Sequence, residues 1–318
     1  MAKLKAILGP YPPPFRGVEM QSKLEFEQLR GKALFLGTSD SPFNGKNICL
    51  VKRGPFAVNG PQLLLKIFLH RNEISEISAH YATTFGFLAA VAKKLFGIPY
   101  TVTCHGSDVN LNMKRLFFRI FNNIALKNAD KIFVVSKDLG AELIERGYNH
   151  KKIIHKPNQI DKKVFKKLNV KKKNQILCAG AIQYTKGTDL LVDAFIQIAP
   201  QLPNYSLLLV GKAAENSFAN DLRSKIHSAG LQKRIHFAGE KTPAELAKIM
   251  NESKLFVMPS RSEGYGMALA EALACGLKAV ATNVGGLKEA GKSKNCIFVN
   301  PNSEEISRAI LNQLKYFS

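Results

Sequence analysis

The sequence predicts an α/β protein built from two Rossmann-like domains, each with a parallel sheet covered by helices. At 318 residues, the chain is long enough for two domains that each bury a core. Short apolar runs alternate with helical patterns in both halves, which is typical of parallel strands joined by helices. A basic stretch of low periodicity, residues 162–173, separates the halves. We therefore predict a first domain at 1–168 and a second at 169–318.

The first half opens with a strand at Leu4–Leu8, a proline-rich turn at 9–14 and a helix from about Val18 to Leu29. Further strands are predicted at Ile77–His80, Tyr100–Thr103 and Lys131–Val135, and helices at Gly86–Leu95 and Leu116–Leu126. Residues 31–70 show no clear pattern. The second half repeats the alternation, with strands at Gln175–Ala179, Tyr205–Val210, Ile235–Ala238, Leu255–Met258, Lys278–Ala281 and Cys296–Val299. Helices such as Asp189–Ala199 and Pro243–Met250 separate these strands, and a last helix is predicted near Glu304–Leu314.

Cysteine usage and hydropathy indicate the compartment. The cysteines are odd in number and scattered, with no Cys-x-x-Cys pair: Cys49, Cys104, Cys178, Cys275 and Cys296. They are typical of small buried residues in a reducing environment. No apolar run reaches the ~18 residues that span a bilayer, and the apolar residues 6–8 are too few for a signal-peptide core. We therefore expect a cytoplasmic protein.

The net charge of +22 is the least ordinary feature of the composition. Residues 1–170 carry 27 Lys and Arg against 12 Asp and Glu, so the excess lies mainly in the first half. Such a charge favours nucleic acid, anionic lipid or anionic substrates as partners, and does not choose among them.

The densest motif is the segment 259–276, in which a strand leads into a loop with two glycines and then a helix of good helix formers. Gly264 and Gly266 allow backbone amides to approach a ligand, and the helix N-terminus favours a diphosphate or a sugar oxygen. Glu263 and Glu271 are about two helical turns apart, and each carboxylate can hold the two hydroxyls of a vicinal diol. Two isolated glutamates would more often be surface residues, but this context favours a nucleotide-sugar site.

Two further side chains follow predicted strands. Lys186 lies before Gly187 in a strand-to-helix loop, where its point charge can reach a phosphate, although exposed loop lysines often have no partner. His105 follows the strand Tyr100–Thr103, at the edge where α/β sheets place ligands. A lone histidine in a turn is more often a hydrogen-bonded structural residue.

Together these motifs resemble the retaining family-4 glycosyltransferases, the glycosyl transferases group 1, which have the GT-B fold of two Rossmann-like domains that face each other across a cleft. The spacing of Glu263 and Glu271 resembles the Glu, seven residues, Glu signature of that family. The resemblance implies that Glu263 contacts the transferred sugar and Glu271 the ribose. The segment 179–187 resembles the family's loop whose lysine, here Lys186, binds the donor diphosphate. The loop between the two glutamates would complete the donor site through Gly264, Tyr265, Gly266 and Met267.

In the first domain, His105-Gly106-Ser107-Asp108 resembles the family's His-Gly-x-Asp turn, which implies that His105 is catalytic and binds the donor sugar. Residues 11–19 resemble its N-terminal glycine loop, with Gly17 as a phosphate or acceptor contact. The chain departs from the family pattern at Arg16, Gln159 and Ala181, and Arg261 is a candidate for the cation missing at Ala181. Family members usually continue beyond the last predicted helix, whereas this sequence ends at Ser318.

The implied activity is that of a hexosyltransferase that moves a hexose-type sugar from a nucleotide diphosphate sugar to an acceptor with retention. The chain lacks an Asp-x-Asp motif, so we expect neither a metal nor another cofactor. Related enzymes often build surface glycans, so a glycan or lipid-linked acceptor is expected in glycan biosynthesis. A basic helix with aromatics at 115–121 would support peripheral membrane binding, although its apolar stripe fits a core-facing surface better.

Three alternatives stay open at this point. A basic nucleic-acid-binding protein fits the charge, but no recognition module is apparent and no nucleic acid is expected. A sugar-nucleotide-modifying relative, such as an epimerase, would keep the fold, but its catalytic carboxylates have no counterpart here. An inactive relative is compatible with the departures at Arg16, Gln159 and Ala181.

Overall fold

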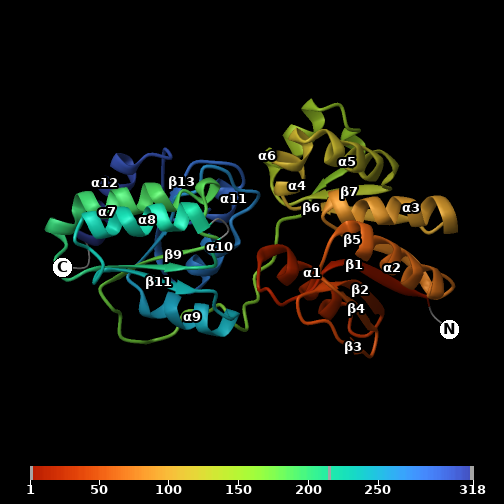
Figure 1. Cartoon of the computed structure of the whole chain (residues 1–318), viewed down its shortest axis with the longest axis horizontal. Helices are drawn as coiled ribbons and strands as arrows, with labels where there is room; N and C mark the ends of the chain where they lie inside the picture. Colours follow the sequence, from red (N-terminus) through yellow and green to blue (C-terminus); the bar gives the residue numbers. More distant parts are fainter. Residues whose placement is uncertain (1–2, 214–215, 316–318) are drawn as a thin grey trace. The chain divides into compact units, whose positions relative to one another are not determined.

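A computed structural model of the chain describes residues 3–213 and 216–315. The chain divides into two compact units, Met1–Gln159 and Ile160–Ser318 (Figure 1). Each unit is an α/β layer structure with a largely parallel sheet, so the predicted fold class is confirmed. The division falls before the predicted junction at 168, because Phe165 is buried in the core of the second unit. The basic stretch therefore begins inside the second unit rather than marking its start.

The first unit contains an eight-stranded sheet in the order β3-β4-β2-β1-β5-β6-β7-β8. Its strands are β1 (Leu4–Pro10), β2 (Ala33–Ser39), β3 (Asn44–Gly45), β4 (Ile48–Lys52), β5 (Ile74–His80), β6 (Tyr100–Cys104), β7 (Lys131–Val134) and β8 (Ile153–His155). All neighbouring pairs are parallel except β3 with β4. The parallel order brings the carboxyl ends of β5 and β6 next to each other, and His80 and His105 lie there.

Helices cover this sheet on both faces, as expected where β2 is buried at every position. They are α1 (Gly17–Gln28), α2 (Phe56–Leu69), η1 (Ala82–Gly86), α3 (Phe87–Phe96), α4 (Ser107–Asn110), η2 (Asn112–Lys114), α5 (Leu116–Asn128), α6 (Lys137–Glu145) and η3 (His150–Lys152). Residues 31–70, which carry no clear sequence pattern, form β2, β3, β4 and α2. Asn59, Gly60 and Pro61 interrupt the apolar periodicity of α2, which hides this helix from a sequence analysis.

The second unit contains a six-stranded parallel sheet in the order β11-β10-β9-β12-β13-β14. Its strands are β9 (Gln175–Ala179), β10 (Ser206–Val210), β11 (Ile235–Gly239), β12 (Leu255–Met258), β13 (Lys278–Thr282) and β14 (Cys296–Val299). Its helices are η4 (Tyr184–Lys186), α7 (Thr188–Ile198), η5 (Ala199–Gln201), α8 (Asn216–Ser228), α9 (Pro243–Glu252), α10 (Met267–Ala274), α11 (Leu287–Ala290) and α12 (Ser303–Leu314). These bounds agree closely with the predicted elements.

Alternate residues of the central strands build two cores in this unit. Ile176 and Leu255 pack in the cluster that includes α7, α8 and α12, whereas Leu177 and Phe256 pack with α9 and α10. The helices α7 and α8 accordingly lie on the side of the sheet opposite α9 (Figure 1). Because side chains of a strand alternate between faces, both faces must be apolar when both are covered. This is why these strands are continuous apolar runs in the sequence.

Among residues 3–213 and 216–315, the structure has no helix that is both long enough and apolar enough to span a bilayer. The largest fully buried side chains belong to the cores of the two sheets, and include Phe35, Tyr100, Phe195 and Phe256.

The loop after β9 contacts the end of β12 so closely that one position requires glycine. Gly187 has a φ of +64°, and a Cβ there would lie 1.9 Å from the carbonyl oxygen of Pro259.

Substitution by alanine tests this packing, with Gly230 as the matched control. Gly230 has a similar φ of +68° but nothing within 4 Å of an added Cβ. We predict that Gly230→Ala costs about 1 kcal/mol of stability from backbone strain alone. Gly187→Ala should cost at least ~3 kcal/mol because the backbones must also move apart. Urea unfolding measures both, and equal costs would contradict this packing.

Candidate functional site

Three loops of the second unit meet at the carboxyl edge of its sheet, after β9, β12 and β13. Gly187 in the first loop contacts the backbone of Pro259 in the second. A Cβ on Gly285 in the third loop would lie 2.0 Å from the carbonyl oxygen of Glu263, and Gly286 donates a hydrogen bond to that oxygen at 3.3 Å. The second loop is therefore held on both sides by backbone contacts.

Arg261 connects the first two loops through an ion pair, a ring contact and a backbone hydrogen bond. Its guanidinium forms a bidentate pair with Asp189, at 2.7 Å for both bonds, and stacks on the ring of Tyr184 at 3.9 Å. Its backbone N–H donates to Thr185 at 2.9 Å. A planar guanidinium suits both the fork and the ring. The sequence suggested Arg261 as a cation for a phosphate, whereas the structure commits this side chain to Asp189.

The ion pair between Lys186 and Glu263 joins two of the predicted site residues. Lys186 Nζ lies 2.6 Å from Glu263 Oε2, and both side chains are largely shielded from solvent. Lys186 belongs to the η4 turn and Glu263 to the loop after β12, so the sheet brings together residues that are 77 positions apart. An ammonium and a carboxylate held side by side offer a charge for a phosphate next to acceptors for hydroxyl groups.

The remaining predicted residues of this unit surround the start of α10. Gly266 precedes the helix in a left-handed conformation with a φ of +96°, and a Cβ there would lie 2.3 Å from Leu287 Cδ2. The turn formed by Gly264, Tyr265 and Gly266 therefore directs the first amides of α10, beginning at Met267, towards this edge of the sheet. Helix N-termini of this kind attract anions.

Glu271 lies on α10 itself, eight positions after Glu263. It is shielded by the protein, and burial raises the pKa of this carboxyl to about 7. The structure therefore holds a carboxyl group that changes charge near neutral pH, and a hydrogen-bonding ligand would favour its ionised form.

In the first unit, the turn after β6 is organised by Asp108, which is fully buried. Its carboxylate accepts hydrogen bonds from the backbone amides of Ala82 (3.0 Å), His105 (3.1 Å) and Gly106 (2.9 Å). Gly106 has a φ of +112°, which favours glycine. Burial raises the pKa of Asp108, and the backbone hydrogen bonds oppose that rise. Asp108 thus fixes the backbone that carries His105.

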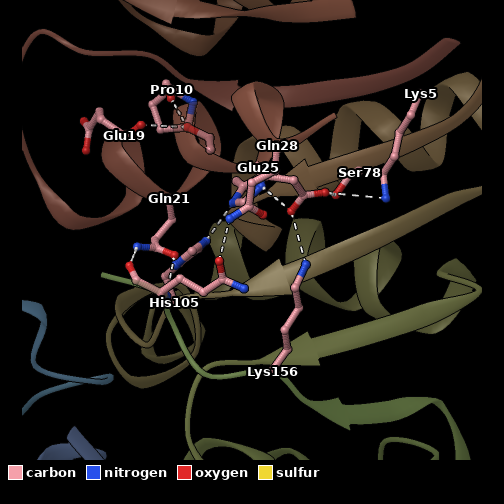
Figure 2. Close-up of polar contacts among 12 residues, drawn as sticks. Lys5, Pro10, Glu19, Gln21, Glu25, Gln28, Ser78, His105 and Lys156 are labelled. Carbon is pink, nitrogen blue, oxygen red and sulfur yellow. Dashed lines mark hydrogen bonds and ion pairs between the residues drawn. The ribbon is translucent and has the colours of Figure 1, made fainter. Parts of the chain in front are cut away.

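The ring of His105 contacts His80, the last residue of β5, with 3.2 Å between His105 Nε2 and His80 Nδ1. His80 Nε2 in turn lies 3.3 Å from Glu25 Oε2 on α1. Lys156 Nζ also lies 3.3 Å from Glu25 Oε2, as Figure 2 shows. Ser78 donates to Glu25 Oε1 at 2.8 Å. Burial alone would raise the pKa of Glu25, but His80 and the nearby lysines hold it well below its usual range.

A pocket of the first unit is lined by Glu25, His80, His105 and Lys156, and its walls come from α1, the ends of β5 and β6, and residues 156–159. The predicted residue Gly17 is the first residue of α1 and is not among the residues that line this pocket. Gln159, one of the departures from the family pattern, is bound to α1: its backbone N–H donates to Gln21 Oε1 at 3.0 Å and its carbonyl accepts from Gln21 Nε2 at 2.6 Å.

The sequence analysis missed His80, Glu25 and Lys156. His80 ends the predicted strand Ile77–His80, so the rule that singled out His105 could have found it. Glu25 has no such signal, since a glutamate in an amphipathic helix is most often a solvated residue. Lys156 is one of many lysines in a basic chain, and only its contact with Glu25 distinguishes it.

The fold and this site define a class of protein, the two-domain glycosyltransferases of the GT-B fold. Two solved structures of that fold are similar to the chain. Anabaena Alr3699/HepE in complex with UDP and glucose has a TM-score of 0.82 at 20% identity and covers 98% of this chain and 90% of its own. WaaG, a glycosyltransferase involved in lipopolysaccharide biosynthesis, has a TM-score of 0.76 at 14% identity, with 98% and 90% covered.

Sequence comparisons then identify the family. The model of Glycosyltransferase Family 4 matches residues 41–164, and that of Glycosyl transferases group 1 matches residues 159–315. The chain belongs to this family of glycosyltransferases. A relative, the uncharacterized glycosyltransferase MJ1178 of Methanocaldococcus jannaschii, is 33% identical over 227 residues, which are 70% of this chain and 60% of the relative. The lipopolysaccharide core mannosyltransferase LpsB of Rhizobium meliloti is 38% identical over 114 residues, 35% of this chain and 32% of the relative.

The raised pKa of Glu271 makes a prediction about stability. The folded protein binds more protons than the unfolded chain between the ordinary value of 4.5 and about 7, so stability falls as pH rises through that window. Glu271→Gln removes this penalty, and should stabilise the second unit by ~1–3 kcal/mol at pH 8 but by little at pH 4.5.

Denaturant unfolding at several pH values measures this difference. Asp221→Asn, at an exposed carboxylate on α8, is the matched control and should not produce it. A stability difference between Glu271→Gln and the wild type that is constant with pH would contradict the burial of Glu271.

Proposed function

We propose that the protein transfers a hexose-type sugar from a nucleotide diphosphate sugar to an acceptor, with retention at the anomeric carbon. The observation that carries this proposal is the contact of 2.6 Å between Lys186 Nζ and Glu263 Oε2, next to the start of α10. It joins a cation suited to a diphosphate with a carboxylate suited to sugar hydroxyls. Similar structures in complex with UDP and with UDP-glucose support a nucleotide-sugar donor.

In this proposal, the bond between the anomeric carbon and the diphosphate oxygen breaks, and a bond forms between that carbon and a hydroxyl oxygen of the acceptor. Negative charge develops on the leaving diphosphate, which takes up the hydroxyl proton. Lys186 and the amides at the start of α10 stabilise that charge electrostatically, without a metal or another resident cofactor. The pre-organised loops contribute because the groups need not reorganise during the reaction. Retention is carried over from the family resemblance.

The other predicted residues take roles around the same donor. Glu263 holds hydroxyls of the transferred sugar, and Glu271 accepts hydrogen bonds from the two ribose hydroxyls, for which its ionised form is suited. The turn Gly264–Met267 binds the diphosphate. From the first unit, His105 contacts the transferred sugar and Gly17 a phosphate or the acceptor.

For the acceptor, we propose a lipid-linked or surface glycan reached at an anionic membrane surface. Helix α5 leaves Leu116 and Phe117 66% and 62% exposed, with Ile120 49% exposed one turn further. Arg115, the residue before this helix, and Arg119 on the helix are both exposed. The apolar stripe that the sequence assigned to the core is therefore partly outside it. Exposed apolar groups beside cations suit anionic lipid headgroups. Relatives named as lipopolysaccharide mannosyltransferases and a phosphatidylinositol N-acetylglucosaminyltransferase subunit support this choice.

A donor panel tests the proposed reaction. Thermal shift and ligand-detected NMR with UDP- and GDP-sugars should show selective binding of one donor by the wild type. Lys186→Ala and Glu271→Ala should each weaken that binding by about 10- to 100-fold, since each removes a charge-assisted hydrogen bond. Lys225→Ala is the matched control, because Lys225 also pairs with a carboxylate (Asp193, 2.7 Å) but lies away from the three loops. A wild type that binds no donor, or a Lys225→Ala variant as weak as Lys186→Ala, would contradict the assignment.

Vesicle flotation tests the membrane part. Binding to vesicles of phosphatidylcholine with phosphatidylglycerol should fall at least about tenfold in the variant Phe117→Ser with Ile120→Ser, because two apolar side chains no longer enter the lipid boundary. Ile297→Ser, at an exposed isoleucine of the second unit, should bind as the wild type does. Binding that survives the double substitution would exclude α5 as the docking helix.

A further inference from the structure

Glu25, His80 and His105 form a connected row of three buried or half-buried groups that come from α1, β5 and the turn after β6. The distances are 3.3 Å from Glu25 Oε2 to His80 Nε2 and 3.2 Å from His80 Nδ1 to His105 Nε2. The two imidazole planes are inclined by only 22°, and their centroids are 5.3 Å apart. Because the facing nitrogens are much closer than the centroids, the rings meet edge to edge, as an imidazole–imidazole hydrogen bond requires.

The charges around this row determine which nitrogens carry protons. Lys156 and Lys5 lie 3.3 Å and 3.5 Å from the carboxylate of Glu25, and Ser78 donates to it. Lys5 Nζ also lies 3.2 Å from Glu76 Oε1. Glu25 is therefore an ionised acceptor, and a lone pair on His80 Nε2 would face its negative charge. His80 Nε2 must carry the proton instead.

The rest of the row follows from that proton. Lys5 and Lys156 already supply positive charge to Glu25, so one proton on His80 is sufficient; Nδ1 of His80 is then an acceptor, and His105 Nε2 is the donor between the two rings. Burial disfavours the charged imidazolium and lowers the pKa of His105 well below its usual range, so His105 is neutral near pH 7. Its Nδ1 is then unprotonated. This atom is buried and has no hydrogen-bond partner among the residues that the structure describes, and Asp108 holds only the backbone beneath it.

We propose that Glu25 and His80 are positioning residues that fix His105 in the tautomer with an unprotonated Nδ1, which accepts a hydrogen bond from a hydroxyl of the transferred sugar. This proposal rests on the proposed function for the identity of the hydroxyl, whereas the tautomer itself does not depend on it. The row resembles a carboxylate–histidine pair that orients a catalytic imidazole, with one further ring inserted; here His80 Nε2 lies at ion-pair distance from Glu25 without hydrogen-bond geometry, so its charge acts on the proton at that nitrogen. A buried acceptor without a partner is costly, so a hydroxyl that satisfies it gains affinity and orientation.

The substitution Glu25→Gln should reverse the direction of hydrogen bonding along the row. Lys5 and Ser78 contact Oε1 and will hold the amide oxygen there, which places the amide NH₂ at the position of Oε2, where it faces His80 Nε2 and displaces Lys156. His80 must then accept at Nε2 and donate from Nδ1, so His105 accepts at Nε2 and carries its proton on Nδ1. The acceptor for the sugar hydroxyl becomes a donor without any change in shape.

Nitrogen-15 NMR of the imidazole side chains tests this directly, in the full chain without a ligand at pH 7. The chain has seven histidines, and the variant His105→Asn assigns the signals of His105. The wild type should show His105 protonated at Nε2 only, and Glu25→Gln should show it protonated at Nδ1. Glu76→Gln is the matched control, since Glu76 contacts Lys5 but neither histidine, and should leave the tautomer unchanged. Protonation at Nδ1 in the wild type would overturn the proposal even if Glu25→Gln fails to fold, as would the same tautomer in both proteins.

Kinetics supply the second readout. Glu25→Gln should lower kcat for sugar transfer by about tenfold or more, with the donor KM little changed, because the diphosphate and ribose contacts remain. Glu25→Asp should recover part of the rate by restoring a carboxylate. A Glu25→Gln enzyme with the wild-type kcat would overturn the positioning role. A wild type that transfers no sugar but shows the expected tautomer would instead contradict the proposed function alone.

Discussion

The contact between Lys186 and Glu263 depends on loops that are held by their backbones. Gly187 lies against Pro259, Gly285 against Glu263, and neither position has space for a Cβ atom. These close approaches leave the three loops little freedom, so the fold itself holds the ion pair of 2.6 Å. Pre-organisation of this kind is what electrostatic stabilisation of a leaving group requires.

The first unit uses buried carboxylates for a similar purpose. The carboxylate of Asp108 accepts hydrogen bonds from three backbone amides and so shapes the turn. The carboxylate of Glu25 contacts two lysines and a histidine, accepts a hydrogen bond from a serine, and sets the charge around His105. Both carboxylates lie in the half of the chain where basic residues are in large excess. Some of these basic side chains therefore neutralise buried carboxylates, and others are exposed on α5.

The sequence predicts the fold well where burial is two-sided. The strands β9 and β12 have buried residues on both faces, and their predicted bounds agree with the structure. Helix α2 was missed because Gly60 and Pro61 break its pattern. Motif spacing singled out Lys186 and Glu263, which the structure pairs at 2.6 Å, and Glu271, which lies on α10. It could not find Glu25, because its role depends on packing between a helix and the ends of two strands, which no local pattern records.

In the proposed function, Lys186 and the start of α10 hold a nucleoside diphosphate. A crystal structure of the chain soaked separately with UDP and GDP tests this most directly. We expect one of the two to bind with its diphosphate oxygens within hydrogen-bond distance of Lys186 Nζ and the first amides of α10, and with Glu271 on the ribose. Binding of neither nucleotide, or binding elsewhere while Lys186 stays paired with Glu263 alone, would contradict it.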